Sequence, residues 1–342
     1  LTFNAMRNKA NLFAEIGPSE TGGVILSGHT DVVPIEGQNW QTDPFKLVEK
    51  NDRLYGRGTC DMKSFNALVL AAVPKMLSSK LKKPIQLAFS YDEEVGCLGA
   101  PQMIKEIRDK LPKAAAVIVG EPTMMSTVNG HKTSIGLKTH LTGVEVHSSL
   151  LHSGVSAIMN GARLIEWINQ QNKNNMLKAT KKMHETFDPP YTTLHVGMIK
   201  GGTAGNITAK DCIFPIDIRC LPSESGENWV KRFKDYAGKV EKEMKGINNS
   251  ANINIEIAHW VTGLKPENIS FAEDLVRRIT LKNGTEMVSY GTEAGQFQSA
   301  GYSTIICGPG SIKQAHQPNE YISNEQFVAG ETFISRLIDL MR

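Results

Sequence analysis

Short apolar runs alternate with amphipathic segments through the first third of the chain, and this rhythm is the feature that most constrains its fold. The apolar runs predict strands at 24–26, 85–90 and 115–119. The segment that begins near Asp61 has apolar residues at helical spacing, with Pro74 predicting a kink, and 98–111 predicts a second helix. Such alternation is typical of an open, mostly parallel α/β sheet.

The rhythm changes in the middle of the chain, where the order becomes strand, helix, two long strands, helix, strand. The strands are predicted at 133–141, 192–200, 210–219 and 253–259, and the helices at 156–171 and 227–244. This order suggests a ferredoxin-like α+β insert. After Leu264 the α/β rhythm returns, with a helix at 271–281, strands at 287–290 and 304–307, and a last helix from Asn324. We therefore expect an α/β domain made of 1–126 and 261–342, with a second domain, 127–260, inserted into it.

The composition is that of an ordinary globular protein: 342 residues, of which 40% are hydrophobic and 21% charged, with a formal net charge of +3. This charge gives no broad electrostatic reason to bind nucleic acid or a membrane surface, and no apolar run has membrane-spanning length. The five cysteines are scattered without a C-x-x-C pair, which favours a reducing cytoplasm. The chain starts with Leu and enters a strand almost at once, so we expect that an N-terminal segment is missing.

Histidine and acidic side chains directly follow four of the predicted strands. In a strand, residues two apart point to the same side, so His29 and Asp31 can address one point in space. Asp61 lies in a glycine-containing turn that feeds a helix. Because ligands of open α/β sheets bind beyond the carboxyl ends of the strands, we expect these side chains to converge. The strand-end residues are His29, Asp31, Glu93, Glu94, Glu121 and His316.

Carboxylates crowded at one sheet edge repel one another and take up protons unless a cation neutralises them. Charge counting favours two divalent ions, because three carboxylate ligands and one bridging hydroxide would balance their four positive charges. Imidazole and carboxylate ligands suit zinc, cobalt or manganese better than calcium or magnesium.

Each part of this set also has a plainer explanation. A histidine after a strand is more often a hydrogen-bonded structural residue than a ligand. Glu93 and Glu94 could cap a helix, Asp61 could be an N-cap, and Glu121 could start a loop. The plainer explanation would have to hold at five places on one sheet edge at once, so we favour the metal site.

The sequence resembles the M20 family of dinuclear metallopeptidases and deacylases over its whole length. The shared motifs are SGHTDVVP, YGRGTCDMK, YDEEVG, VGEPT and GPGSIKQAHQPNEYI. Two stretches, TEA at 292–294 and GPGSI at 308–312, narrow the likeness to the acetylornithine deacetylase branch. The resemblance implies a metallopeptidase-like catalytic domain on a mostly parallel sheet, with the insert as a lid through which two copies form a homodimer.

The resemblance also implies two bound metal ions, zinc with cobalt as an alternative. Asp61 would bridge the two ions. His29 and Glu121 would complete the ligands of one ion, and Glu94 and His316 those of the other.

Three further residues would then belong to the catalytic machinery. Glu93, which is not a ligand, would be the general base. Asp31 would accept a hydrogen bond from the far nitrogen of His29 and so fix its tautomer. His147 of the insert would reach the partner subunit's site and bind the oxyanion, and we prefer it to His152 because it follows the first strand of the insert more closely.

The resemblance implies hydrolysis of N2-acetyl-L-ornithine to L-ornithine and acetate, a step of arginine biosynthesis. Residues expected near the substrate are Arg219, Asn206 and Glu293. Spacing alone does not identify a substrate, so a related hydrolase of acyl amino acids, such as succinyl-diaminopimelate desuccinylase or an aminoacylase, stays an alternative. A protein that keeps the fold without the chemistry is the alternative from a different class, and the complete set of site residues argues against it.

Overall fold

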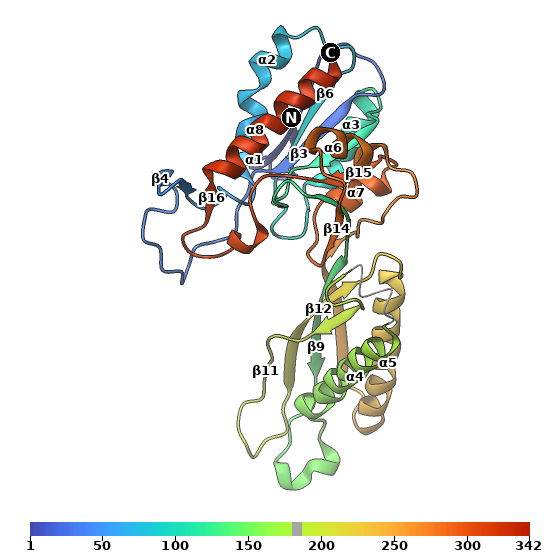
Figure 1. Ribbon diagram of the computed structural model, residues 1–342. Coiled ribbons are helices and arrows are strands. Elements are labelled where there is room, and N and C mark those ends of the chain that lie inside the picture. Colours follow the sequence, from blue (N-terminus) through green and yellow to red (C-terminus); the bar gives the residue numbers. More distant parts are fainter. Residues whose placement is uncertain (180–186) are drawn as a thin grey trace. The chain divides into compact units, whose positions relative to one another are not determined.

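The computed structural model describes residues 1–179 and 187–342, and within these the chain forms two compact units (Figure 1). Residues 1–131, 261–288 and 292–342 form the first, and 132–260 with 289–291 form the inserted unit. The sequence put the first boundary after residue 126. In the structure β8 (Thr127–His131) still belongs to the first unit, because it pairs with β14 and β15 of that unit's sheet.

The first unit is built on a sheet of eight strands in the order β1-β2-β6-β3-β7-β15-β8-β14. The strands β6, β3, β7 and β15 run parallel to their neighbours in this central group, which confirms a mostly parallel α/β sheet. The remaining strand bounds are β1 Thr2–Phe3, β2 Ala10–Ile16, β3 Val24–His29, β6 Ile85–Ser90, β7 Ala116–Val119, β14 Thr285–Val288 and β15 Thr304–Ile306.

Helices cover both faces of this sheet, as the alternation of β3 requires. Val24 and Leu26 pack into a core with α1, α6 and α8, whereas Ile25 between them packs into a second core with α3 and α7. A strand buried on both faces is apolar throughout, as in parallel sheets generally. The helices are α1 Lys63–Ala71, α2 Val73–Ser78, α3 Ala100–Lys110, α6 Phe271–Thr280, α7 Ala294–Ser299 and α8 Asn324–Met341. Pro74 lies at the start of α2, where the predicted kink becomes a break between two helices.

A small antiparallel sheet joins two distant loops of the first unit. Its order is β16 (Tyr321–Ser323), β5 (Arg53–Tyr55) and β4 (Val48–Lys50). The pairing of Tyr321 with Tyr55 connects the segment after His316 to the segment before Asp61.

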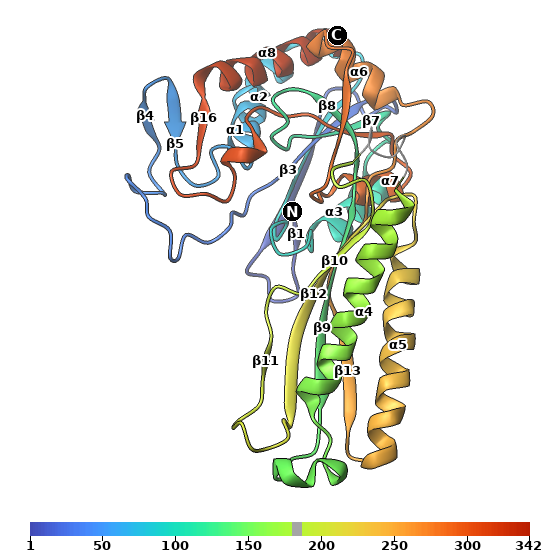
Figure 2. The same cartoon turned by 60° about the horizontal axis from the view of Figure 1, so that its bottom comes forward.

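The inserted unit is an antiparallel sheet with α4 (Ala157–Lys178) and α5 (Gly226–Ile247) packed side by side against it (Figure 2). Its strands are β9 Thr133–Thr142, β10 Thr193–His195, β11 Lys200–Gly201, β12 Asp211–Cys220 and β13 Asn252–Val261. The single strand predicted at 192–200 is wrong. His195 pairs with Asp217 but Lys200 pairs with Ile213, so one extra residue lies between β10 and β11 and interrupts the ladder, as in a β-bulge.

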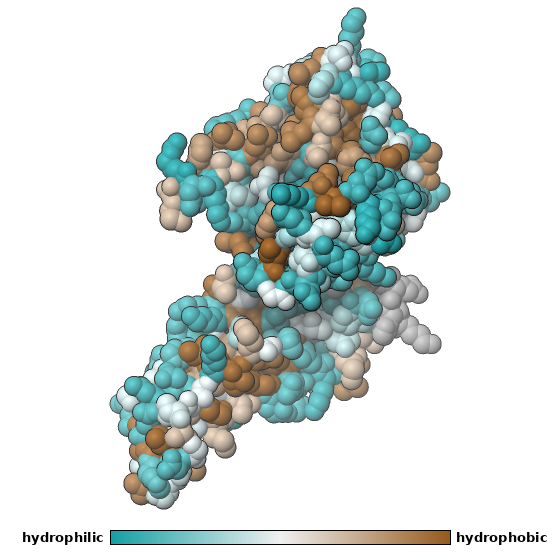
Figure 3. All heavy atoms as spheres, turned by 90° about the vertical axis from the view of Figure 1, so that its left-hand side faces the viewer, coloured by the Kyte–Doolittle hydropathy of each residue, from teal (hydrophilic) through white to brown (hydrophobic). Residues whose placement is uncertain are grey.

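None of the helices in the described part of the chain is long and apolar enough to cross a membrane. The surface drawn in Figure 3 mixes apolar and polar residues on both units.

Candidate metal centre

Asp61 presents one carboxylate oxygen to each of two histidines. Its Oδ1 lies 2.9 Å from His29 Nε2, and its Oδ2 lies 3.2 Å from His316 Nε2. Glu121 Oε1 lies 3.8 Å from the same nitrogen of His29, and Glu94 Oε2 lies 3.1 Å from that of His316. The arrangement therefore has two halves that meet at Asp61.

The two halves come from different parts of the fold. His29 is the last residue of β3 and Glu121 follows the neighbouring strand β7, and both are buried. Glu94 lies in the turn after β6, and His316 lies in the loop after β15. His316 has φ +61°, a left-handed conformation that is uncommon for any residue other than glycine.

The donor atoms lie close enough to share a metal ion. His29, Asp61 and Glu94 form one group, and His29, Glu93 and Glu121 another, with all donor atoms in each group within 4.8 Å of one another. Bonds of about 2.1 Å in a tetrahedral zinc site put ligand atoms about 3.4 Å apart. The separations of 2.9 to 3.8 Å at Asp61, His29, His316 and their partners bracket this value, so the residues present fit a pair of divalent ions.

The plainer explanations of these acidic residues do not describe the structure. The N-cap of α1 is Met62, not Asp61, and no side chain caps it. Helix α3 begins at Ala100 with Gly99 as its N-cap, so Glu93 and Glu94 are not in its first turn.

Asp31 holds the turn that carries the two glutamates. Its Oδ1 accepts a hydrogen bond of 3.1 Å from the backbone amide of Glu93, and its Oδ2 accepts one of 3.1 Å from that of Glu94. His29 Nδ1 lies 3.0 Å from the backbone carbonyl of Asp31 and 3.7 Å from its carboxylate. The structure thus differs from the expected carboxylate contact: the backbone carbonyl of Asp31 accepts the bond that orients His29. The reason is that β3 ends at His29, so the alternation of a strand no longer applies at Asp31.

Glu93 has a partner that the sequence analysis missed. The thiol of Cys97, buried and four residues further on, donates to Glu93 Oε1 at 3.3 Å. Cys97 could have been predicted as a partner of Glu93 only if residues 92–97 had been interpreted as a closed turn. In this turn the backbone amides of Gly96 and Cys97 donate to the carbonyl of Glu93.

The protonation of the site shows that its charges are not balanced by the protein alone. Burial raises the pKa of Glu93 to about 8, and burial together with the charge of Asp61 raises the pKa of Glu121 well above its usual value. Hydrogen bonds to Asp61 and Glu94 raise the pKa of His316 to about 10. The protein without metal therefore keeps protons where a divalent cation would supply positive charge instead.

Residues 25–340 match the peptidase family M20/M25/M40. This chain belongs to that family. It is 34% identical over 335 residues to an acetylornithine deacetylase of Pasteurella multocida, an alignment that covers 97% of this chain and 84% of the relative.

Solved structures of the family have the same fold. An M20 metallo-carboxypeptidase of Sulfolobus solfataricus superposes with a TM-score of 0.75 at 19% identity, covering 97% of this chain and 87% of that one. A Bacillus subtilis protein described as a dinuclear metal-binding peptidase of the M20 family matches with a TM-score of 0.60 at 14% identity, covering 96% and 84%. The M20 enzymes are metal-dependent hydrolases of amide bonds with a dinuclear site, and this chain is an enzyme of that kind.

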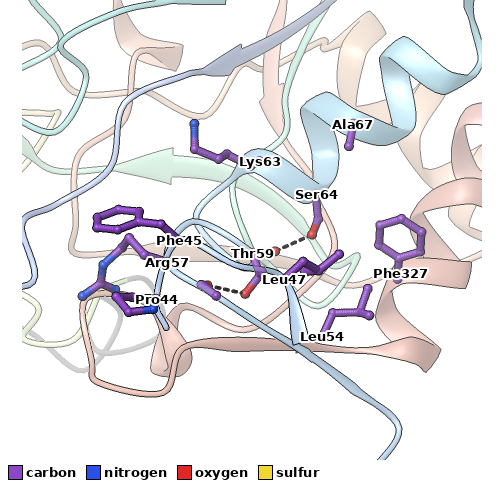
Figure 4. A pocket seen from close by; sticks show the side chains of 11 residues that line it. Pro44, Phe45, Leu47, Leu54, Arg57, Thr59, Lys63, Ser64, Ala67 and Phe327 are labelled. Carbon is purple, nitrogen blue, oxygen red and sulfur yellow. Dashed lines mark hydrogen bonds between the residues drawn. The ribbon is translucent and has the colours of Figure 1, made fainter. Parts of the chain in front are cut away.

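The loop that carries Asp61 is closed by its own side chains. Thr59 Oγ1 donates to the carbonyl of Gly56 at 2.8 Å, and Ser64 Oγ donates to the carbonyl of Thr59 at 2.5 Å (Figure 4). The same loop borders a cavity of about 380 Å³ whose other walls are largely apolar, with Phe45, Leu54 and Phe327 among its lining residues.

Glu293, expected near the substrate, is buried beneath the strand ends instead of lining an open pocket. Its Oε1 accepts a hydrogen bond of 2.5 Å from Ser27, and its Oε2 accepts one of 2.7 Å from Ser90. Ser27 lies in β3, two residues before His29, and Ser90 is the last residue of β6, so Glu293 joins two strands that lead to expected metal ligands.

The three expected residues of the inserted unit do not lie together within one copy. His147 and Asn206 are close, because the backbone amide of Ser148 donates to the carbonyl of Asn206 at 2.8 Å. Arg219 is at the other end of the sheet: it pairs with Ser134, and its Nε donates to Asp217 at 3.0 Å. Asp211, at the end nearer Asn206, is eight residues away along the same strand, which is about 26 Å.

Proposed function

We propose that this M20 enzyme removes the acetyl group from N2-acetyl-L-ornithine. The observation that carries the reaction type is Asp61 between two histidines, with Glu93 beside them and outside the expected ligand set. The likeness to acetylornithine deacetylases over 97% of the chain supports the substrate. The five cysteines are all free and buried, which agrees with the cytoplasmic setting that we also propose for this step of arginine biosynthesis.

We assign the two halves of the site to two divalent ions, preferably zinc, with cobalt as an alternative. His29, Asp61 and Glu121 would hold one ion, and Asp61, Glu94 and His316 the other. Such ions would lower the pKa of a water molecule and polarise the amide carbonyl.

Glu93 takes the proton of the attacking water and returns it to the leaving nitrogen, so that an amine and acetate are released. Asp31 accepts hydrogen bonds from the backbone amides of Glu93 and Glu94. These bonds fix the base and the neighbouring ligand relative to each other.

His147 is suited to bind the oxyanion that develops on the carbonyl. Its Nδ1 accepts a bond of 3.3 Å from the backbone amide of Ser149, so in the neutral ring the proton is on Nε2. Because the side chain is exposed, this N–H can donate to a group of another molecule. We propose that it donates in the site of a second copy.

Exposed apolar side chains near His147 support a homodimer through the inserted unit. Ile207 forms a bridge with His147, and Ile158 at the start of α4 lies against Gly201 and Gly202. Large side chains at least half exposed in the same segments are Leu150, Leu151, Met159, Met198 and Ile199. Figure 3 faces the β11 side of this unit and shows apolar atoms between the polar ones there. Such a surface is typical of an interface.

The decisive experiment measures metal content and hydrolysis of N-acetyl-L-ornithine on one sample, before chelation, after it, and after zinc or cobalt is added back. About two ions per chain with restorable ornithine release would support both parts of the proposal. Two ions without that activity, but with turnover of N-succinyl-diaminopimelate or N-acetyl-methionine, would overturn the substrate and keep the chemistry.

The contribution of a second copy is tested by mixing two inactive variants. His147→Ala and Glu93→Gln subunits should form hybrids with one complete site, and an equal mixture should recover about a quarter of the wild-type activity. A mixture as inactive as its components, in hybrids verified by mass spectrometry, would contradict action in trans.

A further inference from the structure

Glu320 lies four residues after His316 and is almost fully buried, with 1% of its surface exposed. Buried carboxylates are rare unless they are paired, so its partners define what it does. It belongs neither to the ligands nor to the residues expected near the substrate.

Each oxygen of this carboxylate accepts two hydrogen bonds, and all four donors come from the segment 57–61. Oε2 accepts from Arg57 Nη1 at 2.7 Å and from the backbone amide of Gly58 at 3.0 Å. Oε1 accepts from the backbone amides of Cys60 at 2.9 Å and Asp61 at 3.0 Å. The side chain therefore fixes the backbone of the residue that stands between the two histidines.

Arg57 extends this contact to the loop of His316. Its Nη2 donates to Gln38 Oε1 at 2.6 Å, and Gln38 Nε2 donates to the backbone carbonyl of His316 at 3.0 Å. The guanidinium also lies over the ring of Trp40. His316 is held in its left-handed conformation by a group that Arg57 itself positions.

We propose that Glu320, with Arg57 and Gln38, is a positioning device that ties the Asp61 turn to the His316 loop and so creates the second half of the metal centre. The inference rests on the proposed metal site. It predicts an asymmetry between the halves. His29 and Glu121 are held at the ends of neighbouring sheet strands, whereas His316 of the other half lies in a loop that this network holds.

Glu320→Gln tests the device at nearly constant volume. An amide has one acceptor oxygen and one NH2 group, so one of the two donor pairs must face another donor. We expect the affinity for the second metal ion to fall about 10- to 100-fold, the range for lost support of a metal ligand. The affinity for the first ion should fall by a smaller factor, because only Asp61 among its ligands depends on this network and the strand ends stay in place.

The matched control is Glu273→Gln. Glu273 is also a largely buried carboxylate of the first unit, bonded to Arg277, Thr285 and Asn129, and none of these is an expected ligand. The Glu273→Gln variant should have unchanged affinities for both metal ions. Gln38→Ala removes the link to His316, together with the oxygen that accepts from Arg57 and Trp40, and leaves the hydrogen bonds of Glu320 in place. It should weaken the second ion alone, by less than Glu320→Gln does.

Two measurements separate failure of this inference from failure of the metal site. Hydrogen exchange on the metal-free protein should show at least about tenfold faster exchange in Glu320→Gln, whatever the protein binds. The faster amides should be those of the donor pair that faces the NH2 group, either Gly58 or Cys60 with Asp61. Titration with cobalt, followed by its visible spectrum, gives the two affinities.

Unchanged exchange, or equal weakening of both ions, would overturn the positioning role. A wild-type protein that binds no metal would refute the proposed function, whereas changed exchange in Glu320→Gln would still support the link between the loops. If Glu320→Gln does not fold, Gln38→Ala decides between the outcomes, since it removes the link to His316 and leaves all four hydrogen bonds to Glu320 in place.

Discussion

Asp31→Asn removes one of the two bonds that hold the turn of Glu93 and Glu94. Each carboxylate oxygen of Asp31 accepts from one backbone amide, at 3.1 Å in both cases. Asparagine offers one acceptor, so its NH2 group must face one of these amides. Either the base or the neighbouring ligand then moves.

The size of the effect follows from these contacts. A hydrogen bond to a charged acceptor contributes about 1.5–3 kcal/mol. Since the Asp31 side chain is 22% exposed, water replaces part of the lost bond, and we take the lower part of this range, about 1.5–2 kcal/mol. If this loss appears in the transition state, kcat/KM falls about 13- to 30-fold.

The assay is hydrolysis of N-acetyl-L-ornithine at saturating metal, with metal content and melting temperature measured on the same samples. The matched control is Asp92→Asn, in the same turn: Asp92 forms an exposed ion pair with Lys9 at 2.6 Å, which contributes at most about 1 kcal/mol. Asparagine also tolerates the left-handed backbone of Asp92, so this variant should keep activity within about twofold. An Asp31→Asn enzyme within threefold of the wild type would refute the reasoning.

Three further predictions concern the metal and the charges. Glu93→Gln should keep its metal and lose at least about a hundredfold of turnover, whereas Asp61→Ala should lose metal as well; metal analysis of both checks this, and equal loss would mean that the roles of base and ligand are confused. Chelation should lower the melting temperature because the crowded carboxylates lose their cations, with about 2.7 kcal/mol at stake when free metal is about 100 times Kd; calorimetry with metal added back measures it, and an unchanged transition would argue against a structural contribution of the ions. Burial lowers the pKa of Lys132 to about 8, so between pH 8 and 10 the unfolded chain holds a proton that the folded chain has released, and stability should rise with pH. Relative to Lys132→Met the gain should be up to about 1.4 kcal/mol per pH unit, and denaturant unfolding that shows no such difference would contradict it.

The sequence was sufficient for the features that depend on local pattern and on the ends of strands. Apolar runs followed by histidine or acidic residues predicted the bounds of β3, β6 and β7 to within three residues, and the sheet then brings their carboxyl ends to one edge. Because His29 and Glu121 follow neighbouring strands, strand positions alone could indicate that they meet.

The features that the sequence could not predict depend on register and on turns. The sequence predicted that Arg219 and Asn206 both lie near the substrate. Antiparallel pairing with Ser134 instead puts Arg219 at the far end of the sheet. Glu293 is buried by contacts with Ser27 and Ser90, which lie more than 200 residues earlier in the chain. The four donors around Glu320 are mostly backbone amides, and no pattern of side chains encodes them.

The two halves of the metal centre also differ in their contact with water. His29 is buried, whereas the side chain of His316 is 55% exposed. Charges at the buried half interact in a medium of low dielectric, where a cation among carboxylates is held strongly, while water screens the exposed half. The exposed half should therefore exchange its ion faster and lose it first to a chelator. An active site that needs both ions must then stabilise its weaker half by other means, and the loop of His316 has no place in a strand to do so. The hydrogen bonds that Glu320 accepts and that Gln38 donates replace the sheet there, which explains why a fully buried carboxylate lies so close to a site that is already rich in negative charge.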